Sequence, residues 1–267
     1  MRDDLEVGLL GPIWSTWQGH PVRPATRSAF ALLAFLAIEG RPRSREVIGA
    51  NLWPEASAAS SGALRQALWV LRSALAQVGA DPEAVIDSDG DAIGIREGVV
   101  IGVDVERFEE HLRARPPRLE AALATYGGEL AEGWDLEYFA PERERLADLY
   151  EDVLTAAAIQ RLSSGDYRDA HDAALELLRR NPFREEAHVV LMEIYSHVGS
   201  RSQVSRQYRR LRALLSSELG VDPLPETEAA YRAALRGCAV HSADRVRRAR
   251  YPTDEGMMIF PTFRSGA

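Results

Sequence analysis

Hydrophobic and polar positions alternate at the start of the chain. Apolar residues alternate with others over 5–10 as far as a Gly-Pro pair, and a second apolar run over 13–17 ends at a Gln-Gly pair. A period of two that is interrupted by turn residues is typical of short antiparallel strands. We therefore predict short antiparallel strands joined by tight turns in this segment.

Three helices are predicted to follow. Apolar residues cover nearly every side of 26–39, which indicates a buried helix that ends at Gly40. Ser44 is a good N-cap for a short helix over 45–53, because its hydroxyl can accept a hydrogen bond from the first turn. A longer amphipathic helix runs from about 57 to 78.

The long helix has two different faces. At about 100° per residue, its inward stripe consists of four leucines, Leu64, Leu68, Leu71 and Leu75. The opposite face is predicted to carry Gly62, Gln66, Trp69, Val70, Ser73 and Gln77. Arg65 and Arg72 lie on its flank, two turns and roughly 10 Å apart. This helix is predicted to pack by one side and to present the other to a partner or to solvent.

Strand patterns return after the long helix. Residues 84–87 and 92–96 flank an Asp-Gly turn, which is the strongest short sequence signal for a β-hairpin. Residues 99–103 can add another strand, and Asp104 is a candidate N-cap for the helix that follows. Strands, three helices and a hairpin are the order of a winged helix-turn-helix, in which a helix enters the DNA major groove and the hairpin touches the adjacent backbone.

From residue 119 onward the pattern is helical. We predict helices over 119–131, 141–163, 166–180, 184–198, 201–219 and 225–236. The turns at Gly165 and Gly199 are 34 residues apart, which is the period of tetratricopeptide repeats. The predicted organisation is an α+β winged helix-turn-helix domain over 1–115, an all-α tetratricopeptide-like domain over 116–240, and a disordered tail over 241–267. The chain is thus expected to be predominantly α-helical.

Composition favours a cytoplasmic protein with no membrane association. The 267 residues are 46% hydrophobic and 27% charged, and the longest uninterrupted apolar run, 29–38, is about half of a membrane span. The N-terminus opens with acidic residues rather than with a secretory leader. The single cysteine, Cys238, cannot form an internal disulfide, which is most simply explained by a reducing compartment.

Charge is distributed unevenly along the chain. All 32 basic residues are arginines, and 40 acidic residues give a net charge of −8. This balance argues against indiscriminate nucleic-acid binding by the whole chain, since phosphates need net or local positive charge. Residues 1–77, however, hold eight arginines and six acids, so the first segment is slightly positive.

Sequence signals for catalysis are missing. The six histidines show no metal-ligand spacing, and Cys238 has no identifiable catalytic partner. There is no P-loop, no GxGxxG after a strand and no GxSxG elbow. We therefore expect no enzyme activity, no catalytic residues, no bound metal and no cofactor.

Two sets of residues are candidates for DNA contact. Bidentate pairing of Gln with adenine and of Arg with guanine favours base reading by the long helix, through Arg65, Gln66, Trp69, Arg72 and Ser73. Basic side chains at a helix start and on the hairpin suit phosphate, which favours Arg43, Ser44, Arg45 and Arg96. Two alternatives stay open: Trp69 and Val70 can pack against the hairpin or a neighbouring domain, and the basic turn can simply be solvated.

Several stretches resemble the Streptomyces antibiotic regulatory protein family. They are LEVGLLGPIW at 5–14, GHPVR at 19–23, RSAFALLAFLAIEGRPRSREVIGANLWPE at 27–55 and LRQALWVLRSAL at 64–75. In the second half, the stretches YGGELAEGWDLEYFAPERERLADLYEDVL at 126–154 and VSRQYRRLRALLSSELGVDPLPETEAAY at 204–231 look like the bacterial transcriptional activator domain of those regulators. The most specific piece is ELGVDPLPE at 218–226, and the resemblance covers about 5–236.

The resemblance implies an OmpR-like winged-helix domain followed by a tetratricopeptide-like domain. Such proteins bind promoter repeats on double-stranded DNA, often as a pair, and recruit RNA polymerase to biosynthetic gene clusters. By position, helix 57–78 becomes the recognition helix and the hairpin over 84–96 becomes the wing. Many members have an arginine where this chain has Val70, which implies weaker phosphate contact. No ATPase or phosphopeptide-binding domain is visible, so no switch of those kinds is expected.

We predict a sequence-specific, DNA-binding transcriptional activator that acts as a homodimer. The alternative is a protein-interaction adaptor whose winged helix no longer binds DNA. The net charge of −8 and the large apolar residues Trp69 and Val70 favour that alternative. A salt titration separates the two, because DNA binding weakens steeply with salt and an apolar interface does not.

Overall fold

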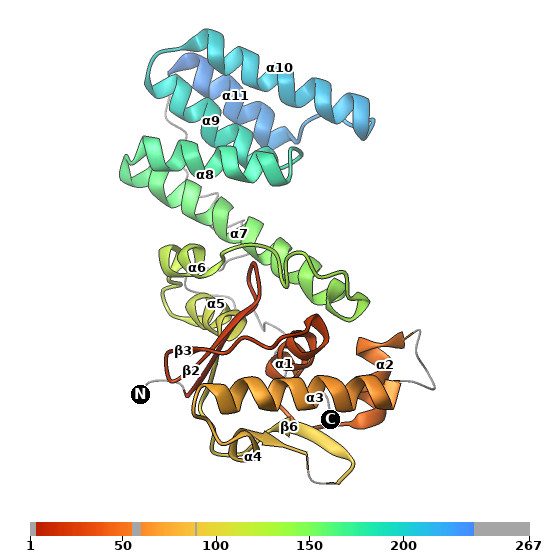
Figure 1. The fold of residues 1–267 in the computed structure, drawn as a ribbon. Helices are drawn as coiled ribbons and strands as arrows, with labels where there is room; N and C mark the ends of the chain where they lie inside the picture. The colour runs from red at the N-terminus through yellow and green to blue at the C-terminus, as the bar shows by residue number, and fades with distance from the viewer. Residues whose placement is uncertain (1–3, 55–59, 89, 238–267) are drawn as a thin grey trace. The chain divides into compact units, whose positions relative to one another are not determined.

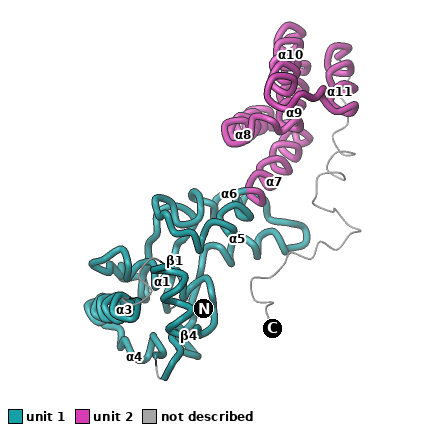
Figure 2. The backbone as a smooth tube through the Cα atoms, turned by 90° about the vertical axis from the view of Figure 1, so that its right-hand side faces the viewer, with its two compact units in different colours: residues 1–147, 260–267 teal, residues 148–259 magenta. Residues whose placement is uncertain are grey.

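The computed structural model describes residues 4–54, 60–88 and 90–237. It is predominantly helical and divides into two compact units, Met1–Ala147 with Phe260–Ala267, and Asp148–Ile259 (Figure 2). The tail predicted to be disordered, 241–267, lies outside the described residues.

A four-stranded sheet lies in the first unit (Figure 1). Its order is β3 (His20–Pro21), β2 (Trp14–Trp17), β1 (Leu5–Gly8) and β7 (Ile101–Val103). The predicted antiparallel strands at the start of the chain are confirmed, since β1 pairs antiparallel with β2 and β2 with β3. The parallel pairing of β1 with β7 joins segments that are far apart in the sequence.

A buried carboxylate accepts hydrogen bonds from the backbone just after β1. Asp104 is the first residue of α5 (Asp104–Arg113), and its side chain accepts hydrogen bonds from the backbone N–H groups of Leu9 at 2.8 Å and Leu10 at 2.9 Å. Burial raises the pKa of Asp104 above its ordinary value, although the backbone hydrogen bonds act in the opposite direction. Asp104 therefore joins α5 to the N-terminal strand, a contact that the sequence did not predict.

The first unit also contains three longer helices and a small second sheet. The helices are α1 (Arg27–Glu39), α2 (Arg45–Leu52) and α3 (Ser60–Gln77). As predicted, α1 ends at Gly40, and Ser44 caps α2 by accepting from Val47 N at 3.3 Å. After α3 come the short helix α4 (Pro82–Val85) and the strands β5 (Ile86–Asp87) and β6 (Ala92–Ile95). They form a three-stranded sheet with β4 (Arg43–Ser44), which precedes α2, in the order β4, β6 and β5. Strand β4 was not predicted, and it attaches the hairpin to the start of α2.

The inner side of α3 is more extensive than its leucine stripe. Leu64, Leu71 and Leu75 are buried and the helix packs against α1 and α2, as the periodicity predicts. Val70, which the sequence placed on the outer face, is only 6% exposed. Its outer-face placement is therefore wrong and the open alternative of a packed Val70 is confirmed, since Ala67 and Ala74, one turn before and after it, are buried as well.

Residues 119–147 pack with the first unit. The helix predicted over 119–131 ends early, since α6 is Leu119–Thr125. Beyond it Leu130 pairs with Leu10, and the N–H of Ala131 donates to the carbonyl of Leu9 at 2.7 Å. The contact boundary therefore lies after Ala147 rather than at the predicted 115/116.

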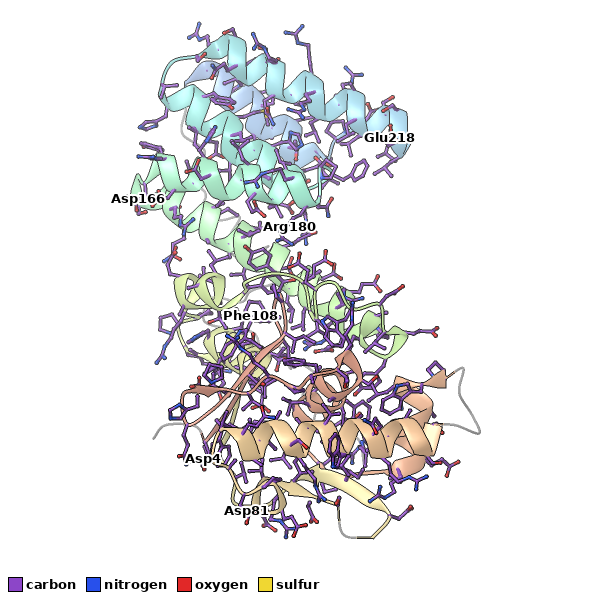
Figure 3. The ribbon with its side chains drawn as sticks, in the orientation of Figure 1. Asp4, Asp81, Phe108, Asp166, Arg180 and Glu218 are labelled. Carbon is purple, nitrogen blue, oxygen red and sulfur yellow. The ribbon has the colours of Figure 1, made fainter. Side chains whose placement is uncertain are left out.

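Aromatic contacts support this extension of the first unit. Phe108 on α5, labelled in Figure 3, lies 5.5 Å from Tyr126, and Phe35 on α1 lies 4.7 Å from Tyr138, measured between ring centroids. Tyr138 is in the short 3-10 helix η2 (Glu137–Phe139), which precedes α7 (Ala140–Ser164). The boundary between the units falls within α7, so a continuous helix passes from one to the other.

The second unit consists of antiparallel helical pairs. It contains most of α7, followed by α8 (Tyr167–Arg180), α9 (Glu185–His197), α10 (Arg201–Glu218) and α11 (Pro225–Arg236). The turn glycines Gly165 and Gly199 both have positive φ, of 87° and 75°, which is a conformation that favours glycine. The predicted 34-residue recurrence of the turn is thus confirmed.

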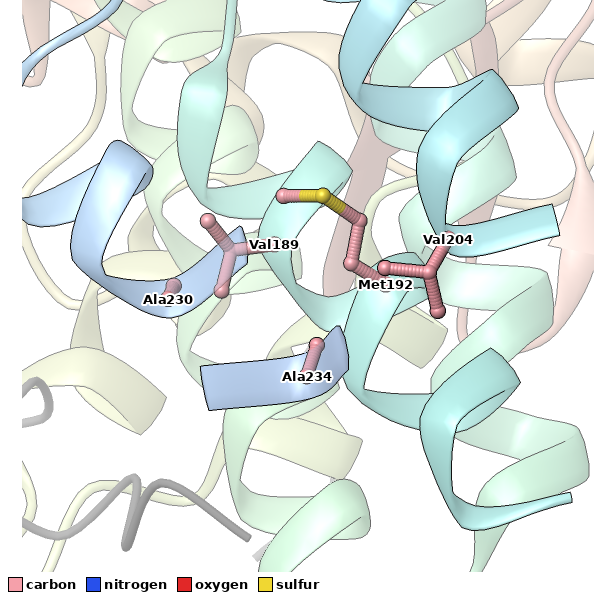
Figure 4. Close-up of a cluster of buried hydrophobic side chains, with 5 residues drawn as sticks. All are labelled: Val189, Met192, Val204, Ala230 and Ala234. Carbon is pink, nitrogen blue, oxygen red and sulfur yellow. The ribbon is translucent and has the colours of Figure 1, made fainter. Parts of the chain in front are cut away.

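Helix α9 is at the centre of this unit. It packs against α8, α10 and α11. Val189, Met192, Val204, Ala230 and Ala234 form a buried cluster that joins three of these helices (Figure 4). The buried His188 lies nearby, and both of its ring nitrogens have polar neighbours. Its Nδ1 is 2.8 Å from Gln207 Nε2, and its Nε2 is 3.0 Å from the carbonyl oxygen of Pro182.

Two features are absent from the described residues. Within them, no helix combines the length and apolar character needed to cross a membrane. The same residues contain no group of three or more His, Cys, Asp or Glu side chains placed to hold a metal ion.

Candidate nucleic-acid interface

The outer face of α3 is the most distinctive exposed surface of the first unit. Trp69 is 66% exposed, and Arg65 and Gln66, one turn before it, are also exposed. The inner face of the same helix is buried, so tertiary packing holds these three side chains outward. Figure 1 shows α3 as a long, uninterrupted helix beside the hairpin region. The exposed indole leaves apolar surface in contact with water, and Trp is enriched where proteins contact their partners.

The side chains on this face differ in how accessible they are to a ligand. Arg65 Nε donates to the carbonyl of Ser61 one turn earlier at 3.4 Å. The hydroxyl of Ser73 donates to the carbonyl of Trp69 at 2.9 Å. Ser73 is half-buried and occupied within its own helix, so Arg65, Gln66 and Trp69 are the more accessible of the predicted base readers.

Arg72 and Arg45 meet at the base of the hairpin. Arg72 Nη2 donates to Ser88 Oγ at 2.8 Å, and Arg45 Nη2 donates to the carbonyl oxygen of Ser88 at 3.1 Å. Arg45 Nε also donates to the carbonyl of Gly90 at 3.3 Å. These bonds connect α3, the start of α2 and the hairpin. Arg72 was predicted to read bases and Arg45 to bind phosphate, and the structure brings both to one serine.

The guanidinium of Arg72 is only partly used by this contact. Its Nε is buried and has no hydrogen-bond partner among the described residues. A buried donor without a partner is costly, so an acceptor brought by a ligand or by water would be favoured here. Arg45 and Arg72 together make the junction of α2, α3 and the hairpin a cationic site.

The other predicted phosphate contacts lie in intramolecular bonds. Arg43 forms an ion pair with Glu39, whose carboxylate also accepts a hydrogen bond from the Tyr138 hydroxyl at 2.6 Å. Burial raises the pKa of Tyr138, with a further contribution from the Glu39 carboxylate. Arg96 Nε donates to the carbonyl of Glu83 at 2.7 Å. Ser44 serves as the N-cap of α2. The side chains of Arg43, Ser44 and Arg96 thus all make contacts that stabilise the fold.

Carboxylates near the hairpin limit where an anion can approach. Asp87 pairs with Arg96 at 3.4 Å, and Asp91 is exposed at the start of β6. Both repel phosphate, whereas the α2–α3 junction with Arg45 and Arg72 attracts it. The backbone N–H of Arg45 also donates to the carbonyl of Asp91 at 2.9 Å, and Ser88, which Arg45 and Arg72 contact, directly follows Asp87, so carboxylates flank the cationic junction.

Sequence reasoning missed Ser88. The Asp-Gly turn located the tip of the hairpin, but the residue that α3 contacts depends on how the hairpin folds over the helix. The only available signal was the predicted proximity of wing and recognition helix, which does not select one residue. Gly90, which accepts from Arg45 through its carbonyl, was identified only as a turn residue.

Comparison with known proteins gives this surface its context. The family described as bacterial transcriptional activator domain matches residues 103–235. The transcriptional regulatory protein EmbR of Mycobacterium tuberculosis is 28% identical over 251 residues, which are 87% of this chain and 63% of EmbR. The regulatory protein AfsR of Streptomyces coelicolor is 27% identical over 237 residues, which are 83% of this chain and 23% of AfsR. The chain thus spans less than two thirds of either curated relative.

A solved structure supports the same relationship at the level of the fold. Mycobacterium tuberculosis EmbR in complex with a low-affinity phosphopeptide matches with a TM-score of 0.74 and 24% identity, over 92% of this chain and 69% of that one. The relatives named here are regulatory proteins, and the structural match shows a shared fold. Residues 103–235 carry a bacterial transcriptional activator domain, and these similarities support the resemblance to the Streptomyces antibiotic regulatory protein family.

Proposed function

We propose that the chain activates transcription by binding promoter DNA through a winged helix-turn-helix in its first unit. Helix α3 is the recognition helix and lies in the major groove with Arg65, Gln66 and Trp69 toward the base edges. The hairpin of β5 and β6 is the wing. The observation that carries the proposal is the outward position of these three side chains on a helix whose other face is fully packed.

Each of the three outward side chains has a definite role in this arrangement. Arg65 and Gln66 can each form two hydrogen bonds with a base edge, Arg with guanine and Gln with adenine. The indole of Trp69 is a large apolar group without a carboxylate or an amide. It therefore suits contact with the thymine methyl group or the sugar edge. Specificity then arises from few polar contacts and one large apolar contact.

Phosphate contact comes from the α2–α3 junction. Arg45 and Arg72 lie together at one edge of α3 and supply the positive charge there. Contacts of this kind fix the register of the protein on DNA without reading sequence. Arg43 and Arg96 contribute by holding β4 and the hairpin in place.

The second unit supplies the remaining properties that the family expects. We propose that it forms the homodimer contacts that let two copies bind promoter repeats, and that it offers a surface to RNA polymerase. The regulated genes are proposed to be a biosynthetic gene cluster, and the protein is proposed to act in the cytoplasm without a cofactor. These assignments rest on the family relationship rather than on a geometric feature of the chain.

Footprinting across a salt series tests the proposal. The full chain is incubated with the promoter regions that flank its own gene, and Arg65→Ala is compared with Arg118→Ala, which removes an equal charge from an exposed position before α6. We expect a protected pair of repeats that fades with salt, a loss of roughly 1–3 kcal/mol for Arg65→Ala and little loss for Arg118→Ala.

The exposed indole of Trp69 is also compatible with a second function, that of a protein-interaction adaptor. Trp69 would equally suit an apolar protein interface, as in an adaptor that no longer binds DNA. Folded protein that protects no DNA at low salt would contradict the proposal and favour the adaptor. Protection that survives Arg65→Ala, Gln66→Ala and Trp69→Ala alike would show that α3 is not the reader.

A further inference from the structure

Helix α10 of the second unit carries a concentration of positive charge that the proposed reader does not use. Its 18 residues contain five arginines, Arg201, Arg206, Arg209, Arg210 and Arg212, and its single acid is Glu218 at the C-terminal end (Figure 3). The other described residues of this unit hold seven arginines and thirteen acids. The cationic character is therefore local to one helix within an otherwise acidic unit.

The arginines of α10 gather on its exposed side. Val204, Gln207, Leu211 and Leu215 bury the opposite side against the rest of the unit. Arg206, Arg209 and Arg210 are exposed and follow an i, i+3, i+4 spacing, so they are neighbours on one surface. Figures 1 and 2 both show α10 at the margin of its unit.

These side chains are not neutralised by the fold. Among the described residues, Arg206 and Arg210 form no ion pair, and Arg209 donates to the carbonyl of Ser205 at 3.2 Å. Arg212 has an exposed carboxylate, Asp222, 3.6 Å away. Elsewhere in the same unit exposed arginines pair with acids on their own helix, as Arg179 does with Glu176 and Arg232 with Glu228. Three like charges within one helical turn repel one another unless an anion lies against them.

The remaining surface of α10 indicates what kind of anion fits. Ser202 and Ser205 lie among the arginines, and α10, which is described throughout, exposes no large apolar side chain. Protein interfaces concentrate apolar and aromatic groups at their centre, and this face has none. Arginine and serine side chains are the usual donors to the phosphates of DNA.

We propose that the exposed face of α10 binds the phosphate backbone of double-stranded DNA beyond the segment read by α3. Arg206, Arg209 and Arg210 supply the charge, and the serine hydroxyls add hydrogen bonds. The contact carries no sequence preference and lengthens the bound DNA. This inference rests on the proposed function, since it requires that the first unit binds DNA.

The test compares three matched forms of the full chain. The first is the parent, and the second is Arg206→Gln/Arg209→Gln/Arg210→Gln. The control is Arg168→Gln/Arg232→Gln/Arg236→Gln, which removes the same charge from exposed positions on α8 and α11. Glutamine keeps the helix propensity, and circular dichroism verifies that all three are equally folded.

The probes are labelled duplexes obtained by selecting double-stranded DNA of random sequence with the parent protein. One duplex contains only the selected site, and the other extends it by flanking DNA on both sides. Affinity is measured for each across salt. Each phosphate contact contributes about 0.9 to the slope of log affinity against log salt concentration. Loss of two or three contacts therefore makes the decline between 50 and 200 mM salt about 10- to 40-fold smaller.

We expect the α10 variant to show this smaller decline on the long duplex and to lose the preference for long over short DNA. The control should resemble the parent. Unchanged salt dependence and unchanged length preference in the α10 variant would overturn the proposal. The same would follow if the variant bound DNA normally but failed to activate transcription with purified RNA polymerase, because the face would then bind an acidic protein.

Failure of the proposed function gives a different result. If selection with the folded parent enriches no sequence and the parent binds no duplex at low salt, both the function and the role of α10 are refuted. If the parent binds and depends on Arg65 but not on α10, only the present inference fails.

Discussion

Helices α3 and α10 have the same length but opposite outer surfaces. The exposed side of α3 presents Trp69, Gln66 and Arg65, whereas that of α10 presents three neighbouring arginines. A surface that distinguishes bases needs few, chemically different groups, and one that holds a phosphate chain needs repeated charge. A chain with a net charge of −8 can therefore carry two chemically distinct exposed surfaces, because its charge is locally organised.

The two units also differ in what holds them together. In the first unit, contacts between distant segments dominate, such as the hydrogen bonds from Leu9 and Leu10 to Asp104. In the second, each helix packs on its neighbours in sequence, with α9 at the centre. Damage to one distant contact should therefore affect the whole first unit, while the second should respond locally.

The largest expected effect is on the first unit. Asp104→Ala leaves the N–H groups of Leu9 and Leu10 buried without an acceptor, which should cost roughly 2–6 kcal/mol in the free energy of unfolding. All five tryptophans precede residue 148, so their fluorescence during urea unfolding reports this unit alone. The exposed Asp135→Ala serves as the control and should change little. Equal stability of both variants would show that the buried carboxylate is not a central contact.

Adjacent residues on α3 separate recognition from packing. Val70→Ala removes buried surface and should lower the free energy of unfolding by up to about 1.5–3 kcal/mol, with little direct effect on DNA contact. Trp69→Ala should leave stability within about 0.5 kcal/mol, since the side chain is 66% exposed, but should weaken DNA binding. Urea unfolding and DNA titration of both variants provide the comparison. Loss of stability in Trp69→Ala would place the indole in a packed contact instead.

A double-mutant cycle tests the junction of α3 and the hairpin. Arg72→Ala and Ser88→Ala remove opposite ends of one 2.8 Å hydrogen bond. If Arg72 positions the hairpin through Ser88, their effects on DNA affinity should be non-additive by about 0.5–3 kcal/mol. Additive losses would mean that Arg72 contacts DNA independently of the hairpin.

The smallest effect is a pH dependence confined to the second unit. Burial lowers the pKa of His188 below its ordinary value of 6.5, so the folded state favours the neutral imidazole. Its stabilising contribution is complete above that value and is lost as the pH falls below it. Thermal unfolding of the helices, followed by circular dichroism, should therefore shift down on acidification less in His188→Gln than in the parent. Identical shifts in the two proteins would exclude His188 as the cause.

Local sequence patterns predicted most elements and part of the site. The cap at Ser44, the helix end at Gly40 and the paired turns at Gly165 and Gly199 depend on nearby residues, so they could be predicted correctly. The end of α6 at Thr125 could not, because the next segment pairs with Leu10, more than a hundred residues earlier. Likewise, nothing in the sequence near Arg72 indicated its bond to Ser88.

Periodicity and composition determined the helical character of this protein, its repeat period and the surfaces on which Arg65, Gln66 and Trp69 lie. The resemblance to the regulatory family was also visible in its motifs. Only the tertiary structure decided that Val70 is buried, that Arg43 pairs with Glu39, and that Arg45 and Arg72 share Ser88. The reason is physical: a helix assigns each residue to a face by local geometry, but burial and pairing depend on which distant element covers that face.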